Sequence, residues 1–153
     1  MKTKTSLLLY KGKVRKGITM NKKEILTFIT KNNIGYLATT EGKAPRVRGM
    51  DTYRADENGL IFYTSKSKSV YKQIAANPEV EVCYFAKGLQ VRVRGKMEMV
   101  EDMALKKEIV ASRSFLGDYS EADFKDMGVC RLKGKALTWT MEGGDGASSF
   151  IEL

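Results

Sequence analysis

The chain has 153 residues, of which 42% are hydrophobic and 29% are charged, and it carries a formal net charge of +9 at pH 7. A chain of this length is expected to fold as one domain with a substantial apolar core. The sequence contains no histidine, which excludes Ser-His-Asp catalysis, His-ligated haem and zinc sites of the His-Glu-x-x-His type. We therefore predict no metal site and, for any enzymatic activity, a mechanism without imidazole.

The positive charge is concentrated at the N-terminus. Residues 1–23 contain eight basic and no acidic side chains, so the remaining 19 basic and 18 acidic residues almost cancel. We interpret residues 1–19 as a basic, flexible N-terminal arm and residues 20–153 as the folded domain. Because the charge belongs to the arm and not to the domain, we do not expect nucleic acid as the main partner.

The sequence indicates a cytoplasmic protein. Its N-terminal apolar run, Leu7–Tyr10, is shorter than the about 7–15 residues of a secretory signal, and no stretch approaches the about 18 apolar residues of a membrane-spanning helix. The two cysteines, Cys83 and Cys130, are scattered and indicate no disulfide framework. Cys83 stands in an alternating apolar run, so we predict a buried free thiol there.

A helix is expected at the start of the domain. Asn21 and Glu24 have the spacing of a capping box, and apolar residues at helical spacing follow up to residue 31. The period then changes to two, which predicts strands at residues 34–40, 46–53 and 60–64. Asn58-Gly59, between the last two strands, predicts a type I′ hairpin turn.

The second half of the chain continues in the same way. A short helix after Ser69 ends at Asn77-Pro78, a longer helix runs from Asp102 to about Phe115, and Ser120 starts one more helical segment. Further strands are expected at residues 80–85, 89–100, 135–141 and 148–153, with a turn at 143–146. This predicts a mainly β protein, an antiparallel barrel or sandwich of six or seven strands with three or four peripheral helices.

Two basic clusters are candidate anion sites. Arg46 and Arg48 lie two residues apart in a strand, so both point to one face, where two guanidinium groups suit a phosphate; the alternative is an exposed arginine pair. The segment Tyr63–Ser69 combines hydroxyls, Lys66, Lys68 and N–H groups before a helix. This is typical of an anion site or, alternatively, of a polar helix cap. The hairpin between the clusters would bring them to one end of the sheet.

Two further features lie in later strands. In the run Gln90–Gly95, valines alternate with Gln90, Arg92 and Arg94. RNA-binding barrels also have basic strands, but they normally add stacking aromatic side chains that this strand face lacks. Trp139, the only tryptophan, is either a core residue or a flat wall for a planar ring.

Taken in this order, the motifs resemble the pyridoxamine 5′-phosphate oxidase-like family of FMN-binding split barrels. The matching positions are Arg48, Gly59, Phe62-Tyr63-Thr64, Gln73-Ile74, Asn77-Pro78 and Gln90-Val91-x-Val93-x-Gly95. The resemblance covers about residues 21–100 well and the C-terminal third loosely. It implies an antiparallel split β-barrel and a homodimer with FMN at the subunit interface.

The resemblance also implies roles for single residues. Arg48 would reach the phosphate and ribityl chain of FMN, while Met50 and Gln90 would lie close to its ring. Where the family most often has a phosphate-binding lysine this chain has Val70, so that role passes to Lys68 or Lys66. The expected cofactor-binding residues are Arg46, Arg48, Met50, Tyr63, Thr64, Ser65, Lys66, Lys68, Gln90 and Trp139.

Three interpretations of function stay open. The first is an FMN-dependent oxidoreductase that uses a nicotinamide or similar electron donor on an unidentified small molecule. The second is a protein that binds a flavin or deazaflavin without turnover, and the third is an RNA-binding barrel. The chain ends at Phe150–Leu153 without the histidine-containing segment of the true oxidases, so pyridoxamine phosphate is not expected as the substrate. No side chain stands out as an acid–base catalyst, and none is assigned.

Overall fold

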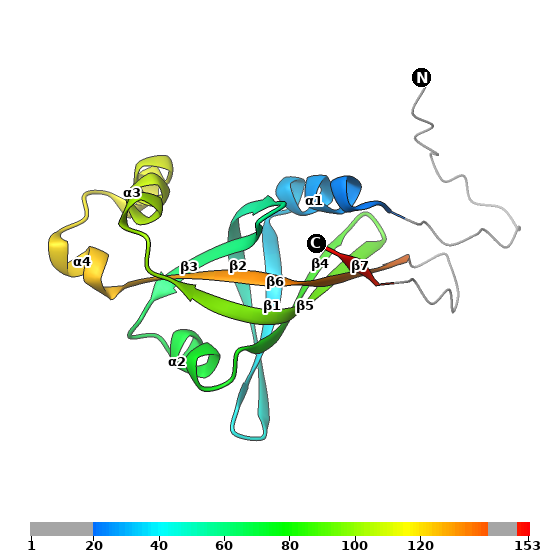
Figure 1. Ribbon diagram of the computed structural model, residues 1–153, viewed down its shortest axis with the longest axis horizontal. Helices are drawn as coiled ribbons and strands as arrows, with labels where there is room; N and C mark the ends of the chain where they lie inside the picture. The colour runs from blue at the N-terminus through cyan, green and yellow to red at the C-terminus, as the bar shows by residue number, and fades with distance from the viewer. Residues whose placement is uncertain (1–19, 141–149) are drawn as a thin grey trace, which may run out of the picture.

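The computed structural model describes residues 20–140 and 150–153. The arm expected at residues 1–19 and the turn expected at 143–146 lie outside these ranges. In chain order the described elements (Figure 1) are α1 (Lys22–Lys31), β1 (Ile34–Glu41), β2 (Ala44–Asp56), β3 (Gly59–Ser65), α2 (Ser69–Ala76), β4 (Glu79–Ala86), β5 (Leu89–Val100), α3 (Met103–Ser112), the 3-10 helix η1 (Ser114–Leu116), α4 (Glu121–Asp126), β6 (Met127–Thr140) and β7 (Ile151–Glu152).

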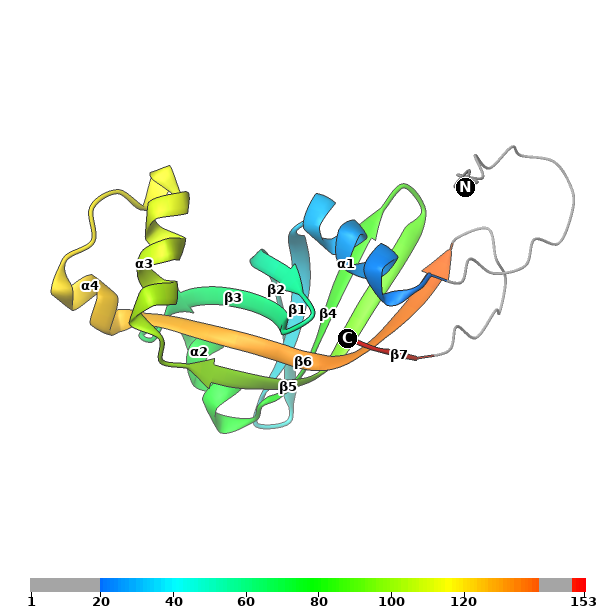
Figure 2. The same ribbon diagram turned by 45° about the horizontal axis from the view of Figure 1, so that its top comes forward.

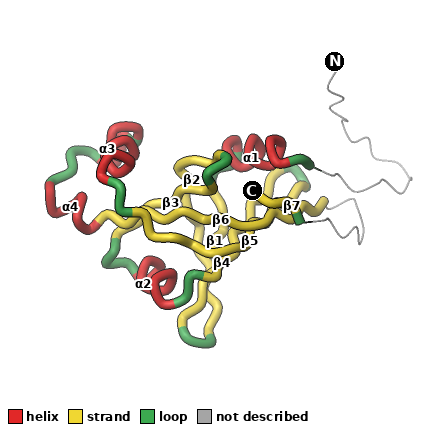
Figure 3. The backbone as a smooth tube through the Cα atoms, viewed as in Figure 1, coloured by secondary structure: helices red, strands yellow, loops and turns green. Residues whose placement is uncertain are grey.

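The strands form a closed antiparallel barrel with one additional strand outside it (Figure 2). Their order is β3-β2-β1-β4-β5-β6-β7, and an extra pairing of β3 with β6 closes the ring of six. One edge of β6 pairs with two different strands. Met127–Leu132 pair with β3, whereas Lys135 and Ala136 pair with β7. The helices lie around the strands, with α3 and α4 together at one end (Figure 3). The expected mainly β barrel with peripheral helices is confirmed.

Alternating side chains fill the barrel. Every second residue of β1 and β4 is buried, and Leu37, Val82 and Tyr84 are fully enclosed. The hydroxyl of Tyr84 shares a hydrogen bond of 2.6 Å with the hydroxyl of Thr52, which satisfies the polar end of the buried ring. The interior is therefore apolar where the side chains are large and polar only where a partner is available.

The expected helix starts are present. Asn21 and Glu24 form the capping box of α1, with N···O distances of 2.9 and 3.0 Å. Ser120 begins α4 with a second capping box, and the Asp102 side chain accepts from the N–H of Leu105 at the start of α3. These bonds satisfy N–H groups that a helix cannot pair internally.

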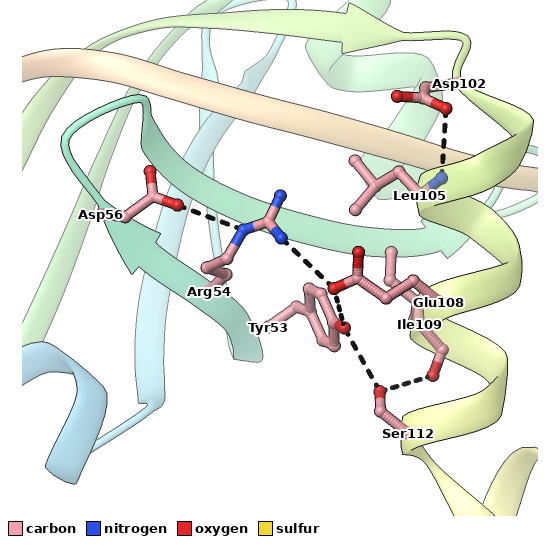
Figure 4. A network of polar contacts seen from close by, with 8 residues as sticks. All are labelled: Tyr53, Arg54, Asp56, Asp102, Leu105, Glu108, Ile109 and Ser112. Atoms are coloured by element: carbon pink, nitrogen blue, oxygen red, sulfur yellow. Dashed lines mark hydrogen bonds and ion pairs between the residues drawn. The ribbon is translucent and has the colours of Figure 1, made fainter.

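Helix α3 packs on the outside of the barrel and creates a second, smaller core, here called the outer cluster. The buried members of the outer cluster are Ile61, Leu105, Ile109, Met127 and Val129. Polar contacts flank it (Figure 4). Glu108 accepts hydrogen bonds from the Tyr53 hydroxyl (2.7 Å) and from Arg54 (3.2 Å), and the Ser112 hydroxyl donates to the Tyr53 oxygen (3.4 Å).

The sequence prediction differs most clearly from the structure at β6 and α3. The last long strand was expected at 135–141 but β6 begins at Met127, because Met127–Cys130 are all buried between the barrel and helices and show no alternation. Helix α3 ends at Ser112 and not near Phe115. The following residue, Arg113, leaves the helical conformation and pairs with Asp51.

The hairpin at Asn58-Gly59 forms, but not with the expected turn. Only Gly59 has a positive φ (+116°), while Asn58 does not, so the pattern of a type I′ turn is absent there. A Cβ on Gly59 would come within 2.6 Å of the Leu132 carbonyl oxygen, because β3 runs directly beside β6. Positive φ at two consecutive turn residues occurs instead at Lys87 and Gly88 (50° and 76°).

Both cysteines are free thiols. Cys130 is buried, and this burial raises the pKa of its thiol to about 12. The prediction of a buried Cys83 is wrong: it is only partly buried, because Val82 and Tyr84 take the inward positions of β4 and leave Cys83 on the outer face. Within the described ranges, no helix is both long and apolar enough to cross a membrane.

Candidate functional site

A cavity of about 410 Å³ lies between the barrel and the segment that contains η1 and α4. Strands β2 and β3 form one wall, and η1, α4 and the residues between them form the other. The lining residues are Gly49, Met50, Asp51, Tyr63, Thr64, Ser65, Lys68, Phe115, Leu116, Tyr119, Asp123, Asp126 and Met127. Five of the predicted cofactor-binding residues are among them, namely Met50, Tyr63, Thr64, Ser65 and Lys68.

Arg46 and Arg48 do not line this cavity, and both have partners within the chain. Arg48 donates to the Thr39 hydroxyl (2.6 Å) and to the side chain of Gln73 in α2 (2.6 Å). Arg46 forms an ion pair of 2.7 Å with Glu41. Burial, followed by repulsion from Arg46, lowers the pKa of Arg48.

The loop before α2 contains the predicted anion donors, but acidic side chains of the same chain already face them. Asp126 accepts from the N–H of Ser67 (3.2 Å) and from the hydroxyl of Ser65 (2.5 Å). Lys66 points to Glu101 (2.7 Å), and this hydrogen bond raises the pKa of Lys66. Local spacing identified the donors and missed their acidic partners, which follow far later in the chain.

Lys68 differs from its neighbours. It precedes α2 and lines the cavity, and its ammonium group makes no hydrogen bond or ion pair with any residue in the described ranges. No described side chain caps the first turn of α2, so the alternative of a polar helix cap does not hold among the described residues, and this helix start can accept an anion. Val70 is 5% exposed and belongs to the core, so the position of the expected phosphate-binding lysine is taken by an apolar side chain.

On the wall formed by β2 and β3, Asp51 is the centre of several polar contacts that sequence reasoning missed. Its carboxylate pairs with Arg113 (2.8 Å) and accepts from the amide of Asn33 (2.5 Å) and the hydroxyl of Tyr63 (3.4 Å). Burial and then the Asp51 charge raise the pKa of Tyr63, so this phenol stays protonated. In the sequence, the only indication of this role of Asp51 was that an acidic residue stands inside the predicted strand 46–53.

Gln90 and Trp139 lie next to each other but far from the cavity. They are cross-strand partners on β5 and β6, and Trp139 is 40% exposed, so it is not a core residue. Tyr63 pairs with Val129 at the other end of β6, and the ten residues from Val129 to Trp139 span about 33 Å in an extended strand. In one chain the predicted site therefore consists of two separate groups.

An apolar face of the barrel accompanies Gln90 and Trp139. Because directly opposed residues share one side of a sheet, the pairings Tyr36–Cys83, Phe85–Gln90 and Gln90–Trp139 place these side chains on the same outer surface. Large exposed side chains on this outer face, with their exposures, are Ile34 (56%), Tyr36 (56%), Val47 (66%), Phe85 (50%) and Trp139 (40%). So much apolar surface is typical of an interaction site.

A larger hollow of about 770 Å³ lies on the outer side of β1, β4, β5 and β6. It contains none of the predicted cofactor-binding residues, and its lysines face acidic neighbours, as in the pairs Lys96–Glu79 (3.5 Å) and Lys135–Glu152 (3.0 Å). The smaller cavity beside α2 is therefore the better candidate site, because it combines a cation without a described partner with aromatic and apolar walls.

Sequence comparison identifies the family. Residues 21–137 match the pyridoxamine 5′-phosphate oxidase family, and the chain belongs to it. A pyridoxine/pyridoxamine 5′-phosphate oxidase of Allorhizobium ampelinum is 32% identical over 73 residues, which are 46% of this chain and 35% of that protein. One of Maricaulis maris is 39% identical over 67 residues, 42% of this chain and 30% of that protein. The chain thus matches only about a third of the length of these curated relatives.

Solved structures agree on the fold. A NimC/NimA family protein of Clostridium acetobutylicum superposes with a TM-score of 0.71 at 24% identity, over 87% of this chain and 92% of that chain. A pyridoxamine 5′-phosphate oxidase-related, FMN-binding protein of Nostoc punctiforme has a TM-score of 0.56 at 15% identity, over 78% and 83% of the two chains. An F420 reductase has a TM-score of 0.54 at 25% identity, over 68% and 87%. The shared fold thus occurs in proteins that use different cofactors.

Proposed function

We propose that the protein is a homodimeric FMN-binding oxidoreductase and that its flavin occupies the cavity beside α2. The observation that carries the proposal is the meeting of Lys68, which has no partner among the described residues, with the uncapped start of α2 at one end of the cavity. A cation and a helix start suit a phosphate. Met50 and Tyr63 supply apolar and aromatic surface further along the same cavity.

The chain's own residues would bind and orient the cofactor. When bound, FMN supplies hydride transfer between a nicotinamide or similar donor and a small molecule. Lys68 and the first turn of α2 would hold the phosphate, and Arg48 would keep α2 in place through Gln73. The protonated hydroxyl of Tyr63 and the Asp51 carboxylate face the cavity as polar groups. We place the protein in the cytoplasm because both described thiols are free.

The separation of the predicted residues supports a dimer. Trp139 on β6 and its cross-strand partner Gln90 on β5 lie too far from Tyr63 for one molecule to touch all three in the same chain. A second copy docked through the outer face with Tyr36 and Phe85 would bring its own Gln90 and Trp139 toward the cavity and bury apolar surface. The site would then be complete only in the dimer.

A deazaflavin is the second candidate cofactor, because an F420 reductase shares the fold at 25% identity. The absorption spectrum of the purified full-length protein, followed by mass spectrometry of any small molecule released by heat, separates the two. We expect a flavin spectrum and the mass of FMN. A colourless protein that takes up neither FMN nor a deazaflavin would refute the proposal. Oxidation of a reduced nicotinamide with an artificial acceptor would then test turnover.

Two substitutions test the binding geometry. Lys68→Gln should weaken FMN binding by about tenfold, because a charge-assisted contact contributes about 1.5–3 kcal/mol. Lys125→Gln removes an exposed ammonium from α4 and should leave binding unchanged. Equal losses in Lys68→Gln and Lys125→Gln would place the phosphate elsewhere.

The proposed dimer is tested on the outer face. Val47→Glu should convert the dimer to a monomer in size-exclusion chromatography and release the flavin, whereas Ala111→Glu, at an exposed position of α3, should not.

A further inference from the structure

One contact of the cavity is not explained by flavin binding. The Asp126 carboxylate accepts hydrogen bonds from the Ser67 N–H (3.2 Å) and from the Ser65 hydroxyl (2.5 Å). These donors belong to the loop that ends at Lys68, and Ser65, Lys68 and Asp126 all line the same cavity. A negative charge of the protein thus lies at the end of the cavity that we assign to the flavin phosphate.

Asp126 is held in this position from two sides. Its carbonyl oxygen accepts from the N–H of Lys66 at 2.7 Å. Two residues earlier, the carbonyl oxygen of Phe124 accepts from Lys106, whose side chain is only 3% exposed and also pairs with Glu101 at 2.9 Å. These contacts hold the backbone of Asp126 against the loop, so an incoming anion would meet the Asp126 charge.

We propose that Asp126 is a specificity-determining residue, an internal anion that limits how strongly the site prefers FMN to riboflavin. This inference rests on the proposed flavin site. A phosphate bound to Lys68 would be repelled by Asp126, whereas riboflavin has no phosphate and is indifferent to that charge. Like charges a few ångströms apart at a protein surface repel strongly enough to alter affinity by about tenfold, which corresponds to about 1.4 kcal/mol.

The test is the ratio of the FMN and riboflavin affinities of full-length apoprotein, measured by flavin fluorescence titration at low ionic strength so that the charge is not screened. Asp126→Asn keeps an oxygen that accepts from the Ser67 N–H and removes the charge, and Asp126→Ser removes the charge with a smaller side chain. Glu121→Gln is the matched control, because it removes the same charge from the exposed side of α4, where Glu121 pairs with Lys125 (3.0 Å).

We expect Asp126→Asn and Asp126→Ser to bind FMN about tenfold more tightly and riboflavin within twofold of the unmodified protein, with no change in Glu121→Gln. Circular dichroism during thermal unfolding identifies a variant that has lost its fold, in which case the other variant decides. An unchanged or smaller FMN-to-riboflavin ratio in a folded variant overturns the role of Asp126 and leaves the flavin proposal intact. If the unmodified protein binds neither flavin, both proposals fail.

Discussion

The barrel interior and the outer cluster beneath α3 are stabilised in different ways. The interior is closed by paired strands on all sides and contains large enclosed side chains such as Phe62 and Tyr84. The outer cluster is small and depends on polar contacts at its edge, among them those of Glu108 and the Asp51–Arg113 pair. Because Leu116 and Tyr119 of the cavity wall pack against the outer cluster, we expect a loss of packing there to alter the site before it unfolds the barrel.

The largest expected effect is in the interior. Phe62→Ala removes a ring that is 1% exposed, and such a cavity typically costs about 3–5 kcal/mol. Phe115→Ala makes the same chemical change at a ring that is 74% exposed, and we expect a cost within about 0.5 kcal/mol. Urea unfolding of both variants checks this difference. Similar losses would mean that Phe115 is covered in solution.

A smaller effect is expected in the outer cluster. Ile109 is fully buried under α3, and Ile109→Ala should cost about 2–4 kcal/mol. If the cluster opens without the barrel, amide hydrogen exchange in this variant will accelerate in α3 while β1 and β4 stay protected. Uniform acceleration in all three elements would show that barrel and outer cluster unfold as one unit.

Gly59 tests the closure of the barrel, because its hairpin lies directly against β6. Gly59→Ala forces a side chain into a positive φ and toward the Leu132 carbonyl oxygen, so we expect a loss of about 1–3 kcal/mol. Gly117→Ala is the control, since its φ is also positive (67°) but a Cβ there would meet no described atom within 4 Å. The difference between the losses of unfolding free energy in the two variants measures the cost of the close approach to Leu132. Equal losses would show that this approach costs nothing.

The barrel could be predicted from the sequence because its signal is local. The strands predicted at 34–40 and 80–85 fall within β1 and β4, where inward and outward residues alternate. The first part of β6 escaped prediction because it touches both the barrel and the outer cluster, so burial there is continuous. A period of two identifies a strand only when one of its faces is polar.

The candidate site was predictable only in part, for a related reason. The donors Ser65 and Lys68 stand in one short polar segment and could be identified from it. Their environment depends on residues distant in sequence, since Asp126 is 61 residues from Ser65, and Glu101 is 35 residues from Lys66. No local pattern encodes such pairs.

The smallest expected effect concerns Glu101, which joins the loop before α2 to α3 and thereby connects the two regions. Hydrogen bonds from Lys66 and then Lys106 lower the pKa of Glu101 below its ordinary value of 4.5. Its contribution is therefore present above that pH and is lost as the pH falls through the lowered value. Since Glu101 is 61% exposed, we expect Glu101→Gln to cost at most about 1 kcal/mol at pH 7.

The matched measurement is the unfolding free energy of Glu101→Gln and of the unmodified protein between pH 7 and pH 3. The two curves should converge at low pH, because the protonated carboxyl and the amide then have the same charge. Glu121→Gln provides the comparison for an exposed ion pair within one helix, whose contribution is smaller still. A difference for Glu101→Gln that persists at pH 3 would show that the shape of the carboxyl group, and not its charge, joins α3 to the loop.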